Sequence, residues 1–143
     1  MGEPFTTPIR VRYGECDMQG VVFNAHYLSY VDVAITELWR AALGSYDVML
    51  DRGVDVVVAE SRLRFHGSAK FDDELTVAVL VTHLGTTSIV TEHSILRGEE
   101  LLVRCEIRHV VVDRESLAKT PIPDWLRTQL AASSAHEPAA EPS

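Results

Sequence analysis

The chain has 143 residues, of which 46% are hydrophobic, and a formal net charge of −8 from 13 basic and 21 acidic residues. This length suits one domain that buries its own core, and the apolar fraction excludes a disordered protein. The acidic balance, without any cluster of Lys and Arg, excludes a protein that binds nucleic acid.

No apolar run approaches the roughly 20 residues that a membrane-spanning helix needs. The N-terminal sequence MGEPFTTPIRVRY lacks the basic and apolar regions of a signal peptide. Two cysteines, Cys16 and Cys105, lie in unrelated local patterns and indicate neither a disulfide framework nor a zinc site. We therefore expect no membrane span and a protein of the reducing cytoplasm.

A half-buried strand is predicted at residues 8–13, where apolar residues alternate with Arg10 and Arg12. The turn residues GECDMQG and a short VVF segment follow. A long helix is then predicted at residues 25–43, and Gly44 is a suitable residue to end it.

Apolar residues cover most of the circumference of this predicted helix. They leave a narrow polar stripe formed by Ser29, Asp32, Thr36 and Arg40, with Glu37 beside it. Such a helix must be covered on most sides. Since the rest of the chain is mostly typical of strands, we expect a curved sheet to wrap around the helix.

From Val54 onward the apolar residues recur with the period of two that is typical of strands. Short connections join these strands and favour antiparallel pairing. The predicted strands cover residues 54–67, 75–84, 86–96 and 101–113, and they follow a short helix predicted at residues 45–52.

The C-terminal part is predicted as a helix followed by a tail. The helix is entered after Pro123, with Asp124 in its first turn. Residues 133–143 are rich in Ala, Pro, Glu and Ser, so we expect a disordered tail after one domain at residues 1–132.

A strand, a turn, a long helix and a four-strand meander describe the hotdog fold. In this α+β fold, an antiparallel five-stranded sheet wraps around a long central helix. The stretch IRVRYGECDMQGVVFNAHYLSYVD closely resembles the signature Y-x-[ED]-x-D-x-x-G-x-V-[YFW]-x-x-x-Y of 4-hydroxybenzoyl-CoA thioesterase-like proteins. AKFDDEL and GTTSIVTEHSI resemble two further motifs of that family. The resemblance covers residues 8–130 and implies a hotdog-fold acyl-CoA thioesterase.

Thioester hydrolysis needs a base or nucleophile at the carbonyl carbon and hydrogen-bond donors where the carbonyl oxygen becomes negative. The N-terminus of a helix offers unpaired N–H groups and the positive end of the helix dipole. Asp17 precedes Asn24 by seven residues, and Gly20 allows a tight turn between them. The loop can thus hold the Asp17 carboxylate near the start of the predicted helix.

The resemblance assigns roles to residues of this motif. It implies that Asp17 acts as general base or nucleophile and that the backbone N–H of Asn24 polarises the thioester carbonyl. The local pattern alone favours an Asx-turn or capping role for Asp17. Substrate contacts are expected from Gly20, Val22, Phe23 and Tyr27, although core packing explains the helix residue Tyr27 equally well.

Tyr13 is the third residue that we assign to the catalytic group. Its own pattern indicates an aromatic side chain of a strand that fills the core. The resemblance instead makes it a pocket wall or a hydrogen-bond partner of the site. The neighbouring Glu15 is expected to be solvated, and Cys16, which has no evident base beside it, is expected to be a small half-buried residue.

One departure from the family pattern lies at Asn24. The thioesterases of the Tol–Pal gene cluster carry a His at this position, and the hydroxybenzoyl-type enzymes carry an aromatic residue. Asn24 cannot exchange protons near neutral pH, which argues against a His-assisted mechanism, whereas a backbone donor survives any side chain. His26 is an alternative, but its position favours an ordinary residue at the start of a helix.

A second departure concerns the phosphates of CoA. Hydroxybenzoyl-type members place basic residues just before the Ser that aligns with Ser88, where this chain has Gly85, Thr86 and Thr87. Hydroxyl and backbone groups of Thr87 and Ser88 can still contact pantetheine or phosphate. Cationic groups that can replace the missing charge, each also explained as a solvated charge, are Lys70, Arg62, Arg64 and Arg97.

No metal site and no cofactor are expected, because the histidines of the predicted strands lack ligand spacing. These residues are His66, His83, His93 and His109. His83 and His93 are candidates for neighbours across the hairpin that turns near Gly85.

Together these features predict a cytoplasmic enzyme that hydrolyses acyl-CoA with Asp17 and the backbone at Asn24. A homodimer or homotetramer is expected, since a lone sheet would leave apolar helix surface and a strand edge exposed. The acyl group is not fixed by the sequence. Three alternatives stay open: a thioesterase for acyl carrier protein, a hotdog dehydratase, which Asn24 disfavours, and a non-catalytic acyl-CoA-binding protein.

Overall fold

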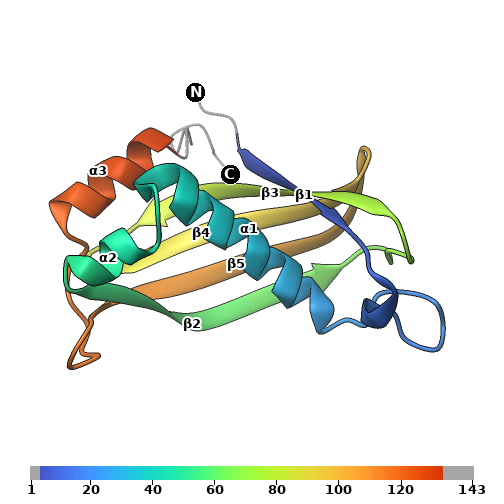
Figure 1. Ribbon diagram of the computed structural model, residues 1–143, viewed down its shortest axis with the longest axis horizontal. Helices are drawn as coiled ribbons and strands as arrows, with labels where there is room; N and C mark the ends of the chain where they lie inside the picture. Colours follow the sequence, from blue (N-terminus) through green and yellow to red (C-terminus); the bar gives the residue numbers. More distant parts are fainter. Residues whose placement is uncertain (1–3, 134–143) are drawn as a thin grey trace.

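The computed structural model describes residues 4–133 (Figure 1). The tail expected at residues 133–143 lies outside this range except for Ser133, which ends the last helix. In chain order the elements are β1 (Phe5–Arg10), a 3-10 helix (Tyr13–Glu15), α1 (His26–Leu43), α2 (Asp47–Asp51), β2 (Val54–Phe65), β3 (Glu74–Leu84), β4 (Ser88–Arg97), β5 (Glu100–Asp113) and α3 (Asp124–Ser133).

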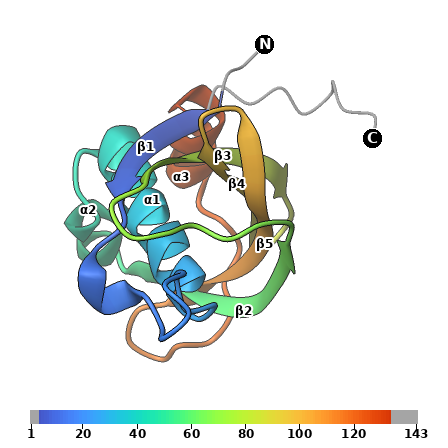
Figure 2. The same cartoon turned by 90° about the vertical axis from the view of Figure 1, so that its right-hand side faces the viewer.

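The strands form one antiparallel five-stranded sheet in the order β1-β3-β4-β5-β2. The sheet curves around α1, which lies in its concave face (Figure 2). The short connections β3–β4 and β4–β5 explain why these strands are neighbours, as the hairpin spacing predicts. The predicted α+β architecture, a five-stranded antiparallel sheet around a long helix, is confirmed.

The apolar stripe of α1 faces the sheet and α3. Its buried residues are Tyr27, Tyr30, Val31, Ala34, Ile35, Leu38, Trp39 and Ala42. They recur every three or four positions, which places them on one side of the helix. The helix ends at Gly44, where φ is +88° and the N–H donates to Arg40 O at 2.8 Å. Glycine adopts this left-handed conformation without steric cost.

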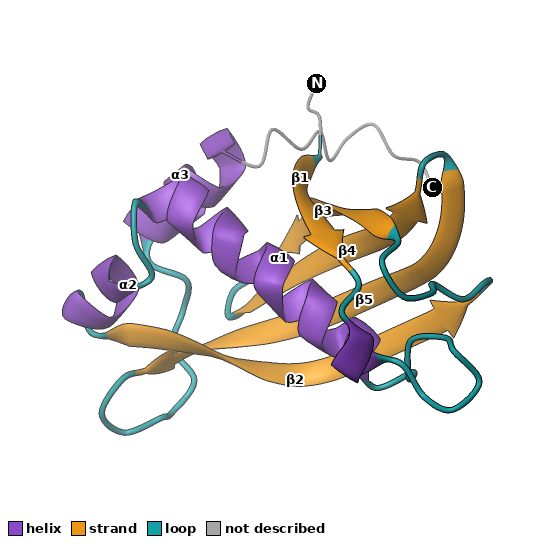
Figure 3. Cartoon of the chain, turned by 45° about the vertical axis from the view of Figure 1, so that its right-hand side comes forward, coloured by secondary structure: helices purple, strands orange, loops and turns teal. Residues whose placement is uncertain are grey.

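The position of α1 leaves the two sides of the concave face unequally covered. The helix packs most closely on β3, β1 and α3. Figure 3 shows α2 and α3 at one end of the sheet and the loop between β1 and α1 at the other. The concave surface beside β2 is therefore less covered than the surface beside β1.

The first strand differs from its prediction. It ends at Arg10 because the chain turns into a 3-10 helix, where Arg12 N donates to Glu15 Oε1 at 2.8 Å. This turn places Tyr13 on the surface, 81% exposed, with its ring edge-on to Phe71 at a centroid distance of 6.0 Å. The expectation that Tyr13 is a strand residue filling the core is wrong.

The β3–β4 hairpin also corrects one expectation. Its turn closes where Gly85 N donates to Ser88 O at 2.8 Å, and the register shifts near His83. His83 lies opposite Val90, and His93 lies opposite Val79. His83 and His93 are therefore not cross-strand neighbours. Within residues 4–133 the helices are too short or too polar to cross a membrane.

Candidate active site

The loop between β1 and α1 folds back onto the segment that precedes β3. Cys16 and Val22 form an antiparallel bridge, and Val21 forms a second bridge with Lys70. Asp17 N donates to Val21 O at 2.9 Å. The loop is therefore a small hairpin, named here the Asp17 hairpin (residues 16–22), with Asp17 next to its tip.

Two tyrosines of α1 hold the segments that flank this hairpin. The Tyr27 hydroxyl accepts a hydrogen bond from Ala69 N at 3.0 Å, and the Tyr30 hydroxyl donates to Glu15 Oε1 at 2.7 Å. Val22 N in turn donates to Ala69 O at 2.9 Å. Burial raises the pKa of both tyrosine hydroxyls, so both keep their protons near neutral pH. Tyr27 and Tyr30 thus link α1 to both sides of the hairpin.

Glu15 is not the solvated residue that the sequence suggested. Its Oε1 accepts hydrogen bonds from the Tyr30 hydroxyl and from Arg12 N. Sequence reasoning missed this contact, although Glu15 fills the acidic position of the motif. Its partner Tyr30 belongs to the buried stripe of α1, which is the only signal in the sequence for this contact.

Asp17 itself is exposed and holds the turn of its hairpin. Asp17 Oδ1 accepts a hydrogen bond from Gln19 N at 2.8 Å, and Gly20 N donates to Asp17 O at 2.9 Å. Gly20 has φ +82°, which explains the glycine. The Asx-turn that the local pattern favoured is therefore present. It uses one carboxylate oxygen, and Oδ2 has no hydrogen-bond partner within residues 4–133.

The start of α1 leaves backbone donors open beside this hairpin. Phe23 N donates to Glu15 O at 3.0 Å, whereas the N–H groups of Asn24 and Ala25 have no acceptor in the part of the chain that the structure describes. Unpaired N–H groups at the positive end of a helix stabilise a negative oxygen. The geometry therefore offers one carboxylate and two backbone donors on adjoining segments.

Large apolar side chains are exposed around this end of the molecule. They are Tyr13, Met18, Phe23 and Phe71. An apolar surface that surrounds a carboxylate is typical of a region covered by a ligand or by another subunit. By contrast, Val22 and Tyr27, expected as substrate contacts, are buried in the core of the single chain.

Thr87 and Ser88 lie far from Asp17 in one chain. The start of β3 adjoins the Asp17 hairpin, through Lys70 and a hydrogen bond of 3.0 Å from Val11 N to Asp73 O. Ser88 follows the opposite end of β3, about 30 Å away at about 3.3 Å per residue. A single subunit therefore does not bring Ser88 to Asp17.

The basic residues expected to bind the CoA phosphates differ in whether they already form ion pairs. Arg97 is engaged, since its guanidinium contacts Asp73 Oδ2 at 2.7 Å and Glu100 Oε1 at 3.0 Å. Lys70 is exposed next to the Asp17 hairpin and has no ion-pair partner within residues 4–133. Lys70 therefore remains the cation nearest to Asp17 along the bridged segments.

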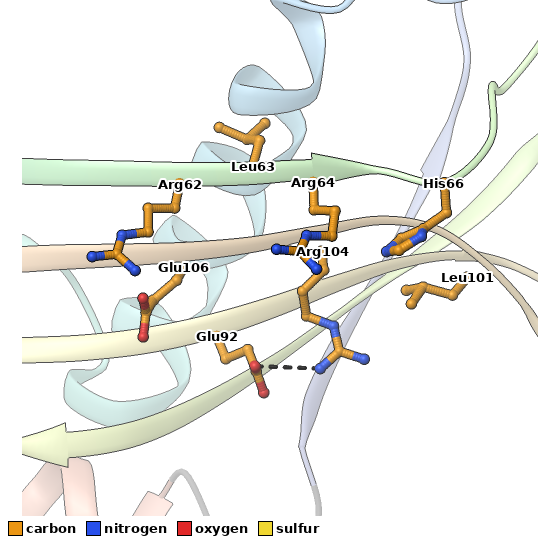
Figure 4. A pocket seen from close by; sticks show the side chains of 8 residues that line it. All are labelled: Arg62, Leu63, Arg64, His66, Glu92, Leu101, Arg104 and Glu106. Carbon is orange, nitrogen blue, oxygen red and sulfur yellow. Dashed lines mark ion pairs between the residues drawn. The ribbon is translucent and has the colours of Figure 1, made fainter.

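A depression of about 800 Å³ lies on the outer face of the sheet, over β2, β4 and β5 (Figure 4). Arg64 of β2 lies directly opposite Arg104 of β5. Arg104 contacts Glu92 at 3.3 Å, whereas Arg64 has no carboxylate partner among the described residues. Arg62 contacts Glu60 at 3.1 Å. Among the arginines of this depression, Arg64 is thus the one without an ion-pair partner in the described residues, and it can bind an anion.

Residues 4–133 contain no evident metal site, because no three His, Cys, Asp or Glu side chains lie together as possible ligands. Cys16 is half-buried and Cys105 is buried, and both are free thiols. His26 packs edge-on to Phe23 at 6.3 Å. None of these residues forms a base–nucleophile pair with Asp17.

Comparisons with known proteins show the family of this chain. Residues 11–130 match the family model of the thioesterase-like superfamily. The chain is 30% identical over 120 residues to the acyl-CoA thioester hydrolase YbgC of Escherichia coli, covering 83% of this chain and 90% of that protein. It is 26% identical over 100 residues to the 4-hydroxybenzoyl-CoA thioesterase of a Pseudomonas species, covering 68% and 71%.

The fold is shared with solved thioesterase structures. The 1,4-dihydroxy-2-naphthoyl-CoA thioesterase from Synechocystis superposes with a TM-score of 0.80 at 21% identity, covering 89% of this chain and 95% of that one. The expectation of a hotdog-fold thioester hydrolase is confirmed. On its sequence and its fold, the chain belongs to the thioesterase-like superfamily.

Proposed function

We propose that this chain hydrolyses acyl-CoA thioesters to a free acid and CoA. One observation carries the proposal: the exposed carboxylate of Asp17 lies on a hairpin that ends two residues before the open N–H group of Asn24, and Tyr27 and Tyr30 hold the segments that flank this hairpin. The names of the relatives support the same substrate class. A carboxylate and preorganised donors are the two elements that thioester hydrolysis requires.

In the proposed reaction Asp17 works through its free oxygen, Oδ2. As a general base it takes a proton from water while the water oxygen bonds to the acyl carbon. The carbonyl oxygen becomes negative and accepts hydrogen bonds from the N–H groups of Asn24 and Ala25. The C–S bond then breaks, the CoA thiolate leaves, and the proton on Asp17 passes to the thiolate or to solvent, which restores the carboxylate. One such donor typically contributes about 3 kcal/mol to lowering the barrier.

Asp17 can alternatively attack the acyl carbon and form an anhydride that water then cleaves. A single turnover in ¹⁸O-labelled water with excess enzyme detects the Asp17 route when water cleaves the anhydride at the Asp17 carbonyl, whereas cleavage at the acyl carbonyl labels the acid as direct attack does. Direct attack by water labels the released acid in the first turnover. Attack by Asp17 gives an unlabelled acid when water cleaves the anhydride at the Asp17 carbonyl, and the label is then found in the enzyme.

The substitution Asp17→Asn tests the proposal. The amide keeps an oxygen that can accept from Gln19 N, so the turn is preserved while the base is lost. We expect kcat to fall by 10²- to 10⁴-fold, about the value of general-base catalysis, with acyl-CoA binding retained. The matched control is Asp113→Asn, because Asp113 also accepts from its own turn, at Ser116 N and Glu115 N. An unchanged rate for Asp17→Asn would falsify the role of Asp17.

We also propose that the active unit is a homodimer joined at β2, or a tetramer of two such dimers. β2 is an edge strand that pairs only with β5 in the sheet, and Val57 and Val58 on it are 44% and 59% exposed. A two-fold axis beside an antiparallel β2 pair sets the far end of the partner next to the Asp17 hairpin. This arrangement can supply Thr87 and Ser88 to a site that one chain leaves incomplete.

A thioesterase for acyl carrier protein would use the same chemistry, so the geometry of Asp17 does not separate it from a CoA enzyme. Rates with a pantetheine-loaded carrier protein and with the matching acyl-CoA distinguish the two. A non-catalytic acyl-CoA-binding protein is distinguished by the Asp17→Asn comparison, since it shows no turnover that the substitution can remove.

A further inference from the structure

The turn between β3 and β4 is polar but carries no charged side chain of its own. It comprises residues 84–88, named here the β3–β4 turn, and it links the two strands through Thr86 and Thr87. Thr86 is exposed, whereas Thr87 and Ser88 are half-buried. The hydrogen bonds of this turn therefore determine what it can bind.

Three carbonyl oxygens of this turn accept hydrogen bonds from backbone N–H groups. They belong to Thr86, Thr87 and Ser88, and each bond measures 2.8 Å. The donors, in the same order, are Ile122, Val111 and Gly85. By contrast, the N–H groups of Thr86 and Thr87 have no acceptor within residues 4–133.

Arg127 of α3 pairs the two remaining carbonyl oxygens of the turn. Its Nη1 donates to Leu84 O at 3.2 Å, and its Nη2 donates to Gly85 O at 2.8 Å. The side chain is half-buried and has no carboxylate partner in the described part of the chain. Because a guanidinium has five N–H donors, Arg127 can hold both carbonyls and still contact an anion.

A small hollow lies over Gly85, between two polar side chains. A Cβ atom at this position would lie 2.9 Å from Ser88 Oγ and 3.2 Å from His83 Nε2. The φ angle of Gly85 is not in the left-handed region, so crowding, and not backbone conformation, is what excludes a side chain here. Neither Ser88 Oγ nor His83 Nε2 has a hydrogen-bond partner among residues 4–133.

The groups around this hollow are suited to an anion that has several oxygen atoms. Backbone N–H groups, hydroxyls and a guanidinium all donate hydrogen bonds to phosphate oxygens. A cation finds no open backbone acceptor, because all five carbonyls of the β3–β4 turn are paired. The chain as a whole has a net charge of −8, so local donors such as these must hold any anion.

The proposed substrate supplies such an anion. The CoA part of an acyl-CoA carries a diphosphate and a separate 3′-phosphate. In the proposed dimer, the β3–β4 turn of one chain lies next to the Asp17 hairpin of the other, so two chains hold the thioester and a phosphate at once. The phosphate that does not occupy the turn is left for a cation such as Arg64 or Lys70.

We infer that Arg127 and the β3–β4 turn bind a phosphate group of the thioester substrate, and that Arg127 also holds the turn in the conformation that presents its donors. The inference rests on the proposed acyl-CoA hydrolysis and adds a binding residue from α3. Its geometric basis is a turn whose carbonyls are all paired while the N–H groups of Thr86 and Thr87 stay open beside a cation.

The experiment compares two substrates that differ only in their phosphates, an acyl-CoA and the matching acyl-pantetheine. Arg127→Met keeps an unbranched apolar stem but removes the charge and the donors. We expect KM for the acyl-CoA to rise by about tenfold or more, the usual effect of one hydrogen bond to a charged group. The kcat for both substrates and KM for the acyl-pantetheine should stay at their wild-type values.

Three further variants separate phosphate binding from a general effect on folding. Arg127→Lys keeps the charge without the planar fork, so its KM for acyl-CoA should lie between those of the wild type and Arg127→Met. Gly85→Ala fills the hollow without changing any charge and should raise KM for the acyl-CoA alone. Arg114→Met is the matched control, because Arg114 Nη1 also donates to a carbonyl, Leu50 O, at 3.1 Å, but outside this turn. Both KM values of the control should be unchanged.

Calorimetry with CoA, which is not hydrolysed, gives a readout that does not depend on turnover. The wild type should bind CoA about tenfold more tightly than Arg127→Met does. The difference should shrink as the salt concentration rises, because salt screens exposed charges. Inorganic phosphate is the second probe. Phosphate binding that depends on Arg127, together with CoA binding that does not, would overturn the inference.

Two other results would also overturn it. One is an equal rise of KM for acyl-CoA and acyl-pantetheine in Arg127→Met, which would show a structural role only. The other is wild-type CoA binding in both Arg127→Lys and Gly85→Ala, a comparison that holds even if Arg127→Met does not fold. A wild type that hydrolyses neither thioester overturns the proposed function, whereas hydrolysis with unchanged KM values in these variants overturns this inference alone.

Discussion

The Tyr30 hydroxyl donates a 2.7 Å hydrogen bond to Glu15 Oε1 and so joins the second turn of α1 to the 3-10 helix that precedes Asp17. Glu15 accepts a further hydrogen bond from Arg12 N. The same carboxylate therefore holds both its own turn and the central helix. The position of the Asp17 hairpin relative to the donors of α1 depends on this link.

Tyr30→Phe should lower both stability and turnover. The substitution leaves Glu15 without its side-chain donor, so we expect the free energy of unfolding to fall by about 1 kcal/mol and kcat to fall, because the Asp17 hairpin is held less firmly. Urea unfolding and steady-state kinetics measure the two effects. Tyr46→Phe is the matched control, since Tyr46 donates to Asp55 away from this site. A kcat lowered equally in both variants would contradict a local role for Tyr30.

Two buried histidines, His93 and His109, should contribute to a loss of stability in acid, because they are protonated more readily in the unfolded chain. An unfolded His titrates near pH 6.5, whereas His93 and His109 titrate at about 3 and about 4 in the folded chain. Between these values the unfolded state binds more protons. The neutral rings therefore contribute fully to the free energy of unfolding above pH 6.5. This contribution falls as the pH is lowered toward 4, by on the order of 1 kcal/mol per pH unit for each ring.

Urea unfolding at pH 7, 6 and 5 measures this decline. His93→Asn and His109→Asn remove one titrating group each and should show a shallower dependence than the wild type. His83→Asn, at an exposed position, should keep the wild-type slope. Equal slopes in all four proteins would show that the two buried rings do not control the acid response.

Most of the fold was predictable because its signals are local. Periodicity and Gly44 placed the long helix at residues 25–43, one residue from the observed α1, and period two placed the four later strands to within a few residues. The alternation of IRVRY also suggested a strand through Tyr13. That prediction failed because the hydrogen bond between Arg12 N and Glu15 turns the chain, and this competing turn has no counterpart in a pattern of apolar residues.

The candidate site was predictable only in part. The motif brings Asp17, Gly20 and Asn24 onto adjoining segments, as its spacing suggested. It gave no information about whether Ser88 meets Asp17 within one chain or across two, because a sequence motif does not distinguish one chain from its copy. The contact between Glu15 and Tyr30 likewise arises from packing between distant segments, so spacing alone could not predict it.

Arg64 should influence both stability and coenzyme binding. It faces Arg104 directly across β2 and β5, and like charges at such positions are unfavourable by a few tenths to about 1 kcal/mol. Arg64→Thr should therefore raise the free energy of unfolding by about 0.5 kcal/mol. If the free guanidinium meets a CoA phosphate, the same variant raises KM for an acyl-CoA but leaves KM for the matching acyl-pantetheine unchanged. An unchanged KM for both the acyl-CoA and the acyl-pantetheine would show that Arg64 does not bind the phosphates and would favour Lys70 as the cation that does.

A charge on the exposed edge of β2 should separate the subunits and abolish turnover. Val58 is 59% exposed on a strand whose outer edge has no partner among the described strands, so a second β2 can pair there. Val58→Asp buries a carboxylate in that interface and should convert dimers to monomers in light scattering after size exclusion. Loss of kcat should accompany the change, because Ser88 of one chain no longer reaches Asp17 of the other. Leu117→Asp, another exposed apolar position, is the control and should leave mass and rate unchanged. A fully active monomeric Val58→Asp variant would show that one chain carries the whole site.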